Sequence, residues 1–156
     1  MKLTHFATLA YVGLAAPVLG ADVTYRNDVK PFLNVSCGEC HGDSSPALAE
    51  FKLDSESYKK EKQGPRFNTY ESLLQIIAYP DSGAFMRRLD DGTMSADRKP
   101  GNMHKHLGET ESERAANLTM LKAWVGAGAW NLNRWKTESG VPGISKEQMN
   151  KLQLTY

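Results

Sequence analysis

The sequence predicts an all-α fold, for three reasons. A capping box, Thr110 to Glu113, opens the strongest amphipathic segment of the chain. Elsewhere, apolar residues recur at the i, i+3, i+4, i+7 spacing of one helical face, at Tyr70, Leu73, Leu74 and Ile77. No segment presents a convincing strand pattern. We therefore expect a small helical domain.

Length and composition exclude several classes of protein. The chain has 156 residues, with 19 Lys and Arg against 18 Asp and Glu, and 40% of it is hydrophobic. This balance excludes a polytopic membrane protein and a disordered charged tail. A formal charge of +1 gives no support to a nucleic-acid partner, because phosphate binding needs an excess of cations. Two cysteines are too few for a disulfide-stapled mini-domain or a four-cysteine zinc site.

Residues 1–20 have the pattern of a secretory signal peptide. Lys2 supplies a positive charge, an apolar run follows over 6–19, and Val18 and Gly20 are small residues at positions −3 and −1 of a cut before Ala21. The run is shorter than the ~20 apolar residues that a membrane span needs. We expect cleavage near Gly20/Ala21, export to a bacterial periplasm, and no transmembrane segment after cleavage.

Short helices joined by loops are expected in the first half of the mature chain. One helix should cover 27–36, with Asn27 as its N-cap. The charged segment 50–66 is interpreted as a solvent-exposed excursion. Helices should follow over 70–79 and 82–89.

A long loop and the capped helix dominate the second half. Segment 90–108 lacks helical periodicity and contains several Gly and Pro residues, and loops of this length in a compact domain are usually functional. The capped helix should end in the small residues 126–129. Trp130, Trp135 and a last helix that starts at Ser145 complete the chain.

The segment from Cys37 to His41 reads C-x-x-C-H, the attachment motif of c-type haem. Two thiols at this spacing, at the end of a helix, can each form a thioether to one vinyl-derived carbon of the porphyrin. His41 then projects its imidazole at the iron from the same face and becomes the proximal ligand. Its second ring nitrogen should donate to a backbone carbonyl, which fixes the tautomer. We expect one covalent haem c, held by Cys37 and Cys40.

Two other chemistries share part of this motif. A redox dithiol would need a thioredoxin-like βαβ context, which the sequence lacks. A zinc site would need more ligands, and the chain has no cysteine besides Cys37 and Cys40. The adjoining histidine and the export signal both favour haem.

The chain resembles the periplasmic monohaem c-type cytochromes with a class I-like fold. The resemblance rests on YRNDVKPFLNVSCGECHG at 25–42 and on ESERAANLTMLKAWVGAGA at 111–129. Members of this family pack an N-terminal helix, which precedes the haem motif, across a C-terminal helix. The resemblance implies a small helical cytochrome c-like domain wrapped around one covalent haem.

Such cytochromes usually take a methionine as the sixth iron ligand, from the loop before the last helix. The resemblance thus implies Met103, seven residues before Thr110, with Met94 of the same loop as the alternative. The other methionines are assigned elsewhere: Met1 to the signal peptide, Met86 and Met120 to helices, and Met149 to the tail. His104 and His106 stay open as alternatives that would give a bis-histidine iron, unless they are ordinary surface histidines.

Methionine ligation raises the potential relative to a second imidazole, and a filled sixth position points to electron transfer. We expect a periplasmic single-electron carrier whose partners are redox proteins of the periplasm. One alternative is a haem electron-transfer subunit of a larger periplasmic oxidoreductase complex. Another is a haem enzyme or gas sensor with an open sixth site.

Three parts are expected along the chain. They are a signal peptide at 1–20, a cytochrome c domain at 21–130 and a C-terminal extension at 131–156, packed on the domain or on a partner. Trp130 and Trp135 could anchor an interface, but core packing is the preferred interpretation.

Overall fold

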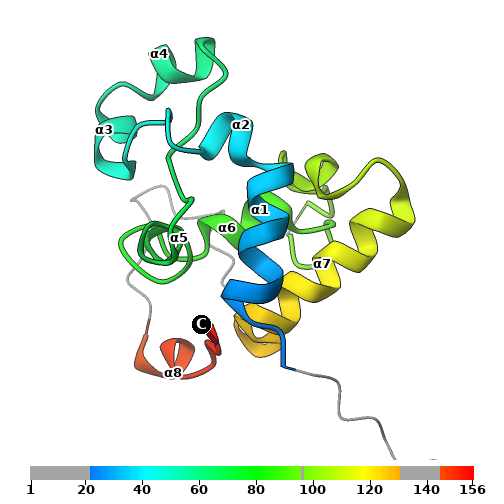
Figure 1. The fold of residues 1–156 in the computed structure, drawn as a ribbon. Helices are drawn as coiled ribbons and strands as arrows, with labels where there is room; N and C mark the ends of the chain where they lie inside the picture. Colours follow the sequence, from blue (N-terminus) through cyan, green and yellow to red (C-terminus); the bar gives the residue numbers. More distant parts are fainter. Residues whose placement is uncertain (1–21, 96, 131–144) are drawn as a thin grey trace, which may run out of the picture.

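A computed structural model describes residues 22–95, 97–130 and 145–156. Within these ranges the chain forms helices and no strand, which confirms the predicted all-α class (Figure 1). In chain order they are η1 (Tyr25–Val29), α1 (Lys30–Ser36), α2 (Gly38–His41), α3 (Leu48–Leu53), α4 (Ser55–Lys60), α5 (Tyr70–Ile77), α6 (Ala84–Leu89), η2 (His104–Leu107), α7 (Glu111–Val125), η3 (Ala127–Ala129) and α8 (Lys146–Met149). The predicted signal segment with its cleavage point, and Trp135, lie outside the described residues. No helix of the described ranges is both long enough and apolar enough to cross a bilayer.

The first helix begins earlier than the sequence predicted. Thr24 has an extended backbone, and its hydroxyl accepts a hydrogen bond from Asn27 N at 3.2 Å. Thr24 is therefore the N-cap of η1, which runs directly into α1. The prediction of Asn27 as the cap was wrong, because its backbone amide is the donor that Thr24 satisfies.

The N-terminal helix, η1 with α1, crosses α7 at the centre of the molecule (Figure 1). Val29 of η1 and Leu121 of α7 are fully buried in the core that forms there. The ring of Tyr25 lies 6.1 Å from the ring of Trp124. This crossing is the one that the resemblance implied.

The capping box predicted at Thr110–Glu113 and the helix start predicted at Ser145 are both present. The Thr110 hydroxyl accepts from Glu113 N at 3.2 Å, and the Glu113 carboxylate accepts from Thr110 N at 3.0 Å. Ser145 and Gln148 make the same reciprocal pair at the start of α8. These short-range signals locate helix starts because they satisfy amides that the helix itself leaves unpaired.

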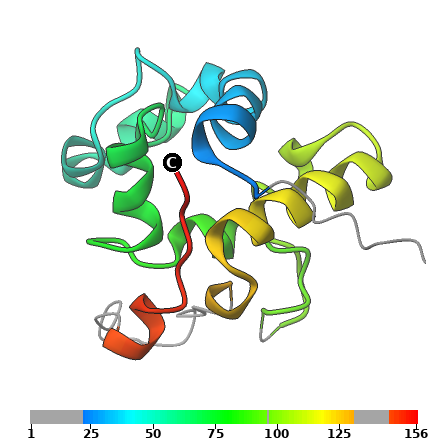
Figure 2. The ribbon, with the colours of Figure 1, turned by 60° about the horizontal axis from the view of Figure 1, so that its bottom comes forward.

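The C-terminal residues run back along the core, between α5 and α7 (Figure 2). Their backbone is fixed by bonds from Gln153 N to Val125 O, Leu154 N to Trp124 O and Tyr25 N to Thr155 O, at 3.1, 2.9 and 2.8 Å. The ring of Tyr156 stacks on that of Tyr25 at 5.7 Å. The division of the chain at residue 130 stays a prediction, since residues 131–144 lie outside the described ranges.

The charged segment 50–66 lies at one edge of the molecule (Figure 1). It contains α4 and most of α3, so it is more regular than the sequence suggested. No residue of α4 is buried, and Leu53 is 88% exposed. The segment is therefore solvent-exposed, as expected, and much of it is helical.

Candidate haem-binding site

The C-x-x-C-H segment is a tight helical turn at the end of the first helix. Cys37 closes α1 with a bond from its amide to Leu33 O at 2.9 Å. Its own carbonyl then accepts from Cys40 N at 3.2 Å and from His41 N at 2.9 Å. Both thiols are half-buried and unpaired. One turn of backbone therefore carries all three side chains of the motif.

The segment 64–67 contacts the imidazole of His41 and fixes its orientation. The Nδ1 atom of His41 lies 2.8 Å from Pro65 O, which is the backbone acceptor that the sequence predicted for the second ring nitrogen. Donation at Nδ1 leaves Nε2 as the atom with a free lone pair. Two backbone bonds attach the segment to the motif, from Gly64 N to Cys40 O at 2.8 Å and from Phe67 N to His41 O at 3.2 Å.

Glycine is required beside this ring. A Cβ at Gly64 would lie 2.1 Å from His41 Cε1, far closer than two carbon atoms approach. The ring of Phe67 stacks on the imidazole with centroids 4.3 Å apart and planes inclined by 26°. The imidazole plane is thus fixed by a hydrogen bond and by two neighbours in contact with it.

Burial sets the protonation of the motif. It lowers the pKa of His41, an effect that the bond to Pro65 opposes and that the charges of His106 and Arg88 reinforce. The neutral imidazole that results is the form that binds a metal. Burial, with a smaller contribution from Cys40, raises the pKa of Cys37 to about 11, so in the haem-free chain its thiol is protonated at neutral pH.

The loop that contains Met103 is attached to the end of α6. The backbone carbonyls of residues 88–90, at the end of that helix, each accept a hydrogen bond from the segment 101–104. The bonds run from Met103 N to Arg88 O, His104 Nδ1 to Leu89 O and Gly101 N to Asp90 O, at 2.9, 2.9 and 2.8 Å. A Cβ at Gly101 would lie 2.3 Å from Arg87 O and from Arg88 O, so only glycine permits this approach. Met103 itself is half-buried and packs against the core.

The alternative ligands lie in different surroundings. Met94 is 42% exposed, and its amide donates to a carboxylate oxygen of Asp90 at 3.0 Å. His104 is buried, which corrects the interpretation of both histidines as surface residues. His106 is exposed, as that interpretation expected.

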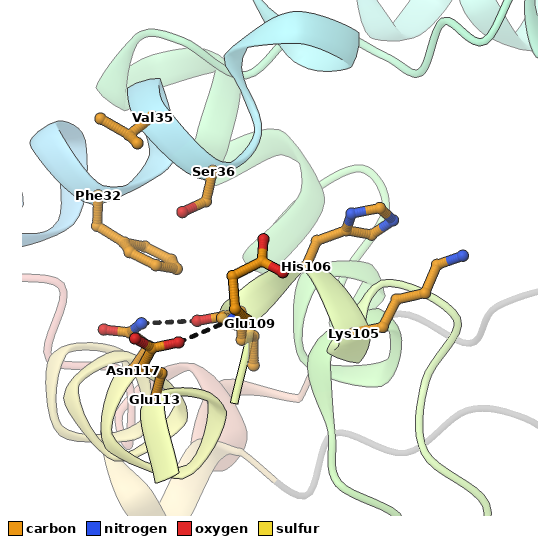
Figure 3. Close-up of a pocket in the computed structure, with 10 residues that line it drawn as sticks. Phe32, Val35, Ser36, Lys105, His106, Glu109, Glu113 and Asn117 are labelled. Carbon is orange, nitrogen blue, oxygen red and sulfur yellow. Dashed lines mark hydrogen bonds between the residues drawn. The ribbon is translucent and has the colours of Figure 1, made fainter. Parts of the chain in front are cut away.

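A groove lies beside the haem motif, between α1 and the segment from η2 to α7 (Figure 3). Its volume is about 480 Å³. Phe32, Val35 and Ser36 line it on α1, and His106 lies on the opposite wall. Val35 is 88% exposed, and Ser36 directly precedes Cys37. The groove thus brings the apolar side chains of Phe32 and Val35, among polar neighbours, next to the attachment point.

Asp90 is the residue whose surroundings the sequence analysis missed. It stands beside Asp91 in a polar stretch, a setting typical of solvated carboxylates, but Asp90 is only 4% exposed. Trp130 Nε1 donates to its carboxylate at 3.1 Å across 40 residues of sequence. The Gly64-Pro65 pair was also missed, although a Gly-Pro dipeptide after the motif is a recognisable signal of a fixed turn.

The donor set of this part of the chain suits a c-type haem. Two unpaired thiols occupy one helical turn, which is what two thioether bonds require. A neutral imidazole whose Nδ1 donates to a carbonyl can coordinate an iron through Nε2. The methionine thioethers of Met94 and Met103 lie in the loop before α7.

Comparisons with known proteins agree with this assignment. A family model described as PccH cytochrome c matches residues 24–156. A solved structure, that of the monohaem cytochrome PccH from Geobacter sulfurreducens, is 48% identical, with a TM-score of 0.74 over 86% of this chain and 99% of that chain. No curated protein matches the chain significantly. The chain therefore belongs to the PccH cytochrome c family and is a monohaem c-type cytochrome with one covalently bound haem c.

Proposed function

We propose that this cytochrome carries single electrons in the periplasm, with its haem attached through Cys37 and Cys40 and with His41 and Met103 as the axial iron ligands. The haem, when bound, supplies an iron that alternates between the ferric and ferrous states. The observation that supports this most strongly is the orientation of His41. Its Nδ1 is engaged by Pro65 O at 2.8 Å, so Nε2 is the ring atom available to iron.

Met103 is preferred over the other candidates because its backbone is fixed. Its amide donates to Arg88 O at 2.9 Å and its side chain packs against the core. Met94 and His106 are exposed, and the ring of His104 is buried against the end of α6. A thioether favours ferrous iron relative to a second imidazole, and it closes the iron to small ligands. Both effects suit a carrier.

The ligand assignment is tested by two matched substitutions in the holoprotein. Met103→Ala should abolish the ferric thioether-to-iron charge-transfer band, lower the reduction potential and open the ferrous iron to carbon monoxide. Met94→Ala should leave all three properties nearly unchanged. Absorption spectra, redox titration and carbon monoxide binding kinetics measure these effects. Reversed roles of the two variants would identify Met94 as the ligand.

Other results would overturn the methionine assignment altogether. If neither substitution changes the spectrum but His104→Ala or His106→Ala does, the iron is bis-histidine. Rapid carbon monoxide binding by the unmutated ferrous protein would indicate an open site. That result would favour a haem enzyme or gas sensor over a carrier.

The periplasmic location depends on residues 1–20. Haem attachment to cytochromes of this class takes place on the outer side of the bacterial inner membrane, so export should precede it. Deleting residues 1–20 should leave haem-free protein in the cytoplasm, as judged by haem staining of cell fractions. Abundant haem-containing protein from the shortened gene would contradict this assignment.

A further inference from the structure

Asp90 is a buried carboxylate at the start of the loop that leads to Met103. Its side chain accepts three hydrogen bonds within the protein. Their donors are Trp130 Nε1, Gly92 N and Met94 N, at 3.1, 2.9 and 3.0 Å. Its backbone carbonyl accepts a fourth, from Gly101 N at 2.8 Å. A carboxylate removed from water persists only where such donors replace its hydration.

Both ends of the loop therefore depend on the same residue. The side chain of Asp90 closes the turn over 90–94, and its carbonyl holds Gly101, two residues before Met103. Gly92 has a φ of +96°, and a Cβ there would lie 2.7 Å from Arg98 O, so the loop folds closely upon itself. A substitution that shifts Asp90 should also shift Met103, because the Asp90 carbonyl holds Gly101, two residues before Met103.

Trp130 anchors the carboxylate to the rest of the domain. Its indole is 4% exposed and packs edge-on against Phe85 of α6, with centroids 6.5 Å apart. Lys122 of α7 places its ammonium 5.7 Å from the indole centroid. The indole is thus held by both the helix before the loop and the helix after it.

We infer that Asp90, fixed by Trp130, is a positioning residue that holds Met103 on the haem iron. This inference rests on the proposed ligation by Met103. The pair would act by limiting the number of loop conformations in which the thioether can leave the iron. Because the side chains are buried and lie within the loop's own framework, their effect should be on ligand exchange and not on haem attachment.

The test compares two neighbouring carboxylates in the full-length holoprotein. Asp90→Asn removes the negative charge and one of the two accepting oxygens, so the side chain can no longer accept from Trp130 Nε1 together with Gly92 N and Met94 N. Asp91→Asn makes the same change one residue away. Asp91 is half-buried, accepts from Thr93 within the turn and faces Lys122 at 4.0 Å. Within the described part of the chain it makes no hydrogen bond to Trp130 and is connected to the indole only through the Lys122 ammonium. Trp130→Phe retains an aromatic ring but removes the Nε1 donor, and it serves if Asp90→Asn fails to fold.

Asp90→Asn and Trp130→Phe should each accelerate carbon monoxide binding to the ferrous protein by on the order of tenfold, the change expected when a hydrogen bond to a charged group is lost. Both should also weaken the ferric charge-transfer band and lower the pH at which alkali abolishes it. Asp91→Asn should behave like the native protein in all three measurements. Haem staining should be unchanged throughout.

Three outcomes would overturn the inference, and they are distinguishable. If Met103→Ala retains the charge-transfer band, the proposed ligation fails and the inference falls with it. If Met103→Ala loses the band but Asp90→Asn and Trp130→Phe match Asp91→Asn, the ligation stands and the positioning role alone is wrong. A uniform loss of melting temperature without any change in ligand exchange would likewise indicate a merely structural pair.

Discussion

The two sides of the proposed iron site are built in different ways. On the His41 side, five consecutive residues carry the motif, and one short segment, 64–67, orients the ring. On the Met103 side, the ligand loop depends on carbonyls at the end of α6 and on Trp130, which lies 40 residues from its partner Asp90. On the first side the haem-binding side chains occupy one stretch of sequence, and the acceptor of the His41 ring, Pro65 O, comes from 24 residues later. The second side exists only when the helices have packed. Substitutions on the His41 side should therefore impair haem attachment, and substitutions on the Met103 side should impair iron ligation.

The largest effect is expected from the thiols. Replacing both Cys37 and Cys40 by serine should abolish covalent haem attachment, since no other cysteine is present. Haem staining after denaturing electrophoresis measures it, with Ser36→Ala as the control from the same turn. A stained band from the double variant would show that another residue attaches the haem.

The two close-packed glycines give the sharpest comparison of the two sides. Gly101→Ala would force a Cβ against backbone carbonyls of α6, so it should destabilise the protein by about 1–3 kcal/mol, as overpacking commonly does, and abolish the charge-transfer band. Gly64→Ala would press on the imidazole of His41, so it should reduce the yield of haem-attached protein while any holoprotein formed keeps the band. Denaturant unfolding and absorption spectra measure both. Equal spectra from the two variants would remove the distinction between the sides.

The difference between the two sides also explains what the sequence could predict. The C-x-x-C-H motif and the Thr110–Glu113 capping box act over a few residues, so their geometry follows from spacing alone. The burial of Asp90 does not, because its donors come from Trp130 and from a folded loop. The burial of His104 does not follow from spacing either, since its acceptor, Leu89 O, is brought to it by the packing of the loop against α6.

An intermediate effect is expected at the surface beside the attachment point. Val35 is 88% exposed and lines the groove next to Cys37, so a partner that approaches the haem here would bury it. Val35→Asp should slow electron self-exchange between ferric and ferrous copies several-fold while the spectrum and the potential stay unchanged. Nuclear magnetic resonance line broadening measures the exchange rate. Leu53→Asp, an equally exposed change on the distant α3, is the matched control.

The smallest effect is expected at the far end of the ligand loop, where α7 begins. Thr110→Ala removes the hydroxyl that accepts from Glu113 N and should lower the free energy of unfolding by about 1 kcal/mol, the usual value for an N-cap. The loop end should stay in place, because Arg114 Nη1 still donates to Gly108 O at 2.9 Å and to Glu109 O at 3.1 Å. The charge-transfer band should therefore persist at neutral pH.

The stability that the Thr110–Glu113 cap contributes depends on pH, in a direction set by the pKa of Glu113. Backbone bonds from Thr110 and Glu109 hold the pKa of Glu113 below its ordinary value of 4.5. A carboxylate with a lowered pKa in the folded state stabilises the fold above its unfolded pKa, and that contribution is lost as the pH falls through the folded value. Glu113→Gln should therefore flatten the acid side of the stability curve, measured by denaturant unfolding between pH 3 and pH 7. An unchanged curve would contradict the role assigned to the Glu113 carboxylate. Loss of the band in Thr110→Ala would mean that this cap also supports the ligand loop, and the Met103 side would then extend to the start of α7.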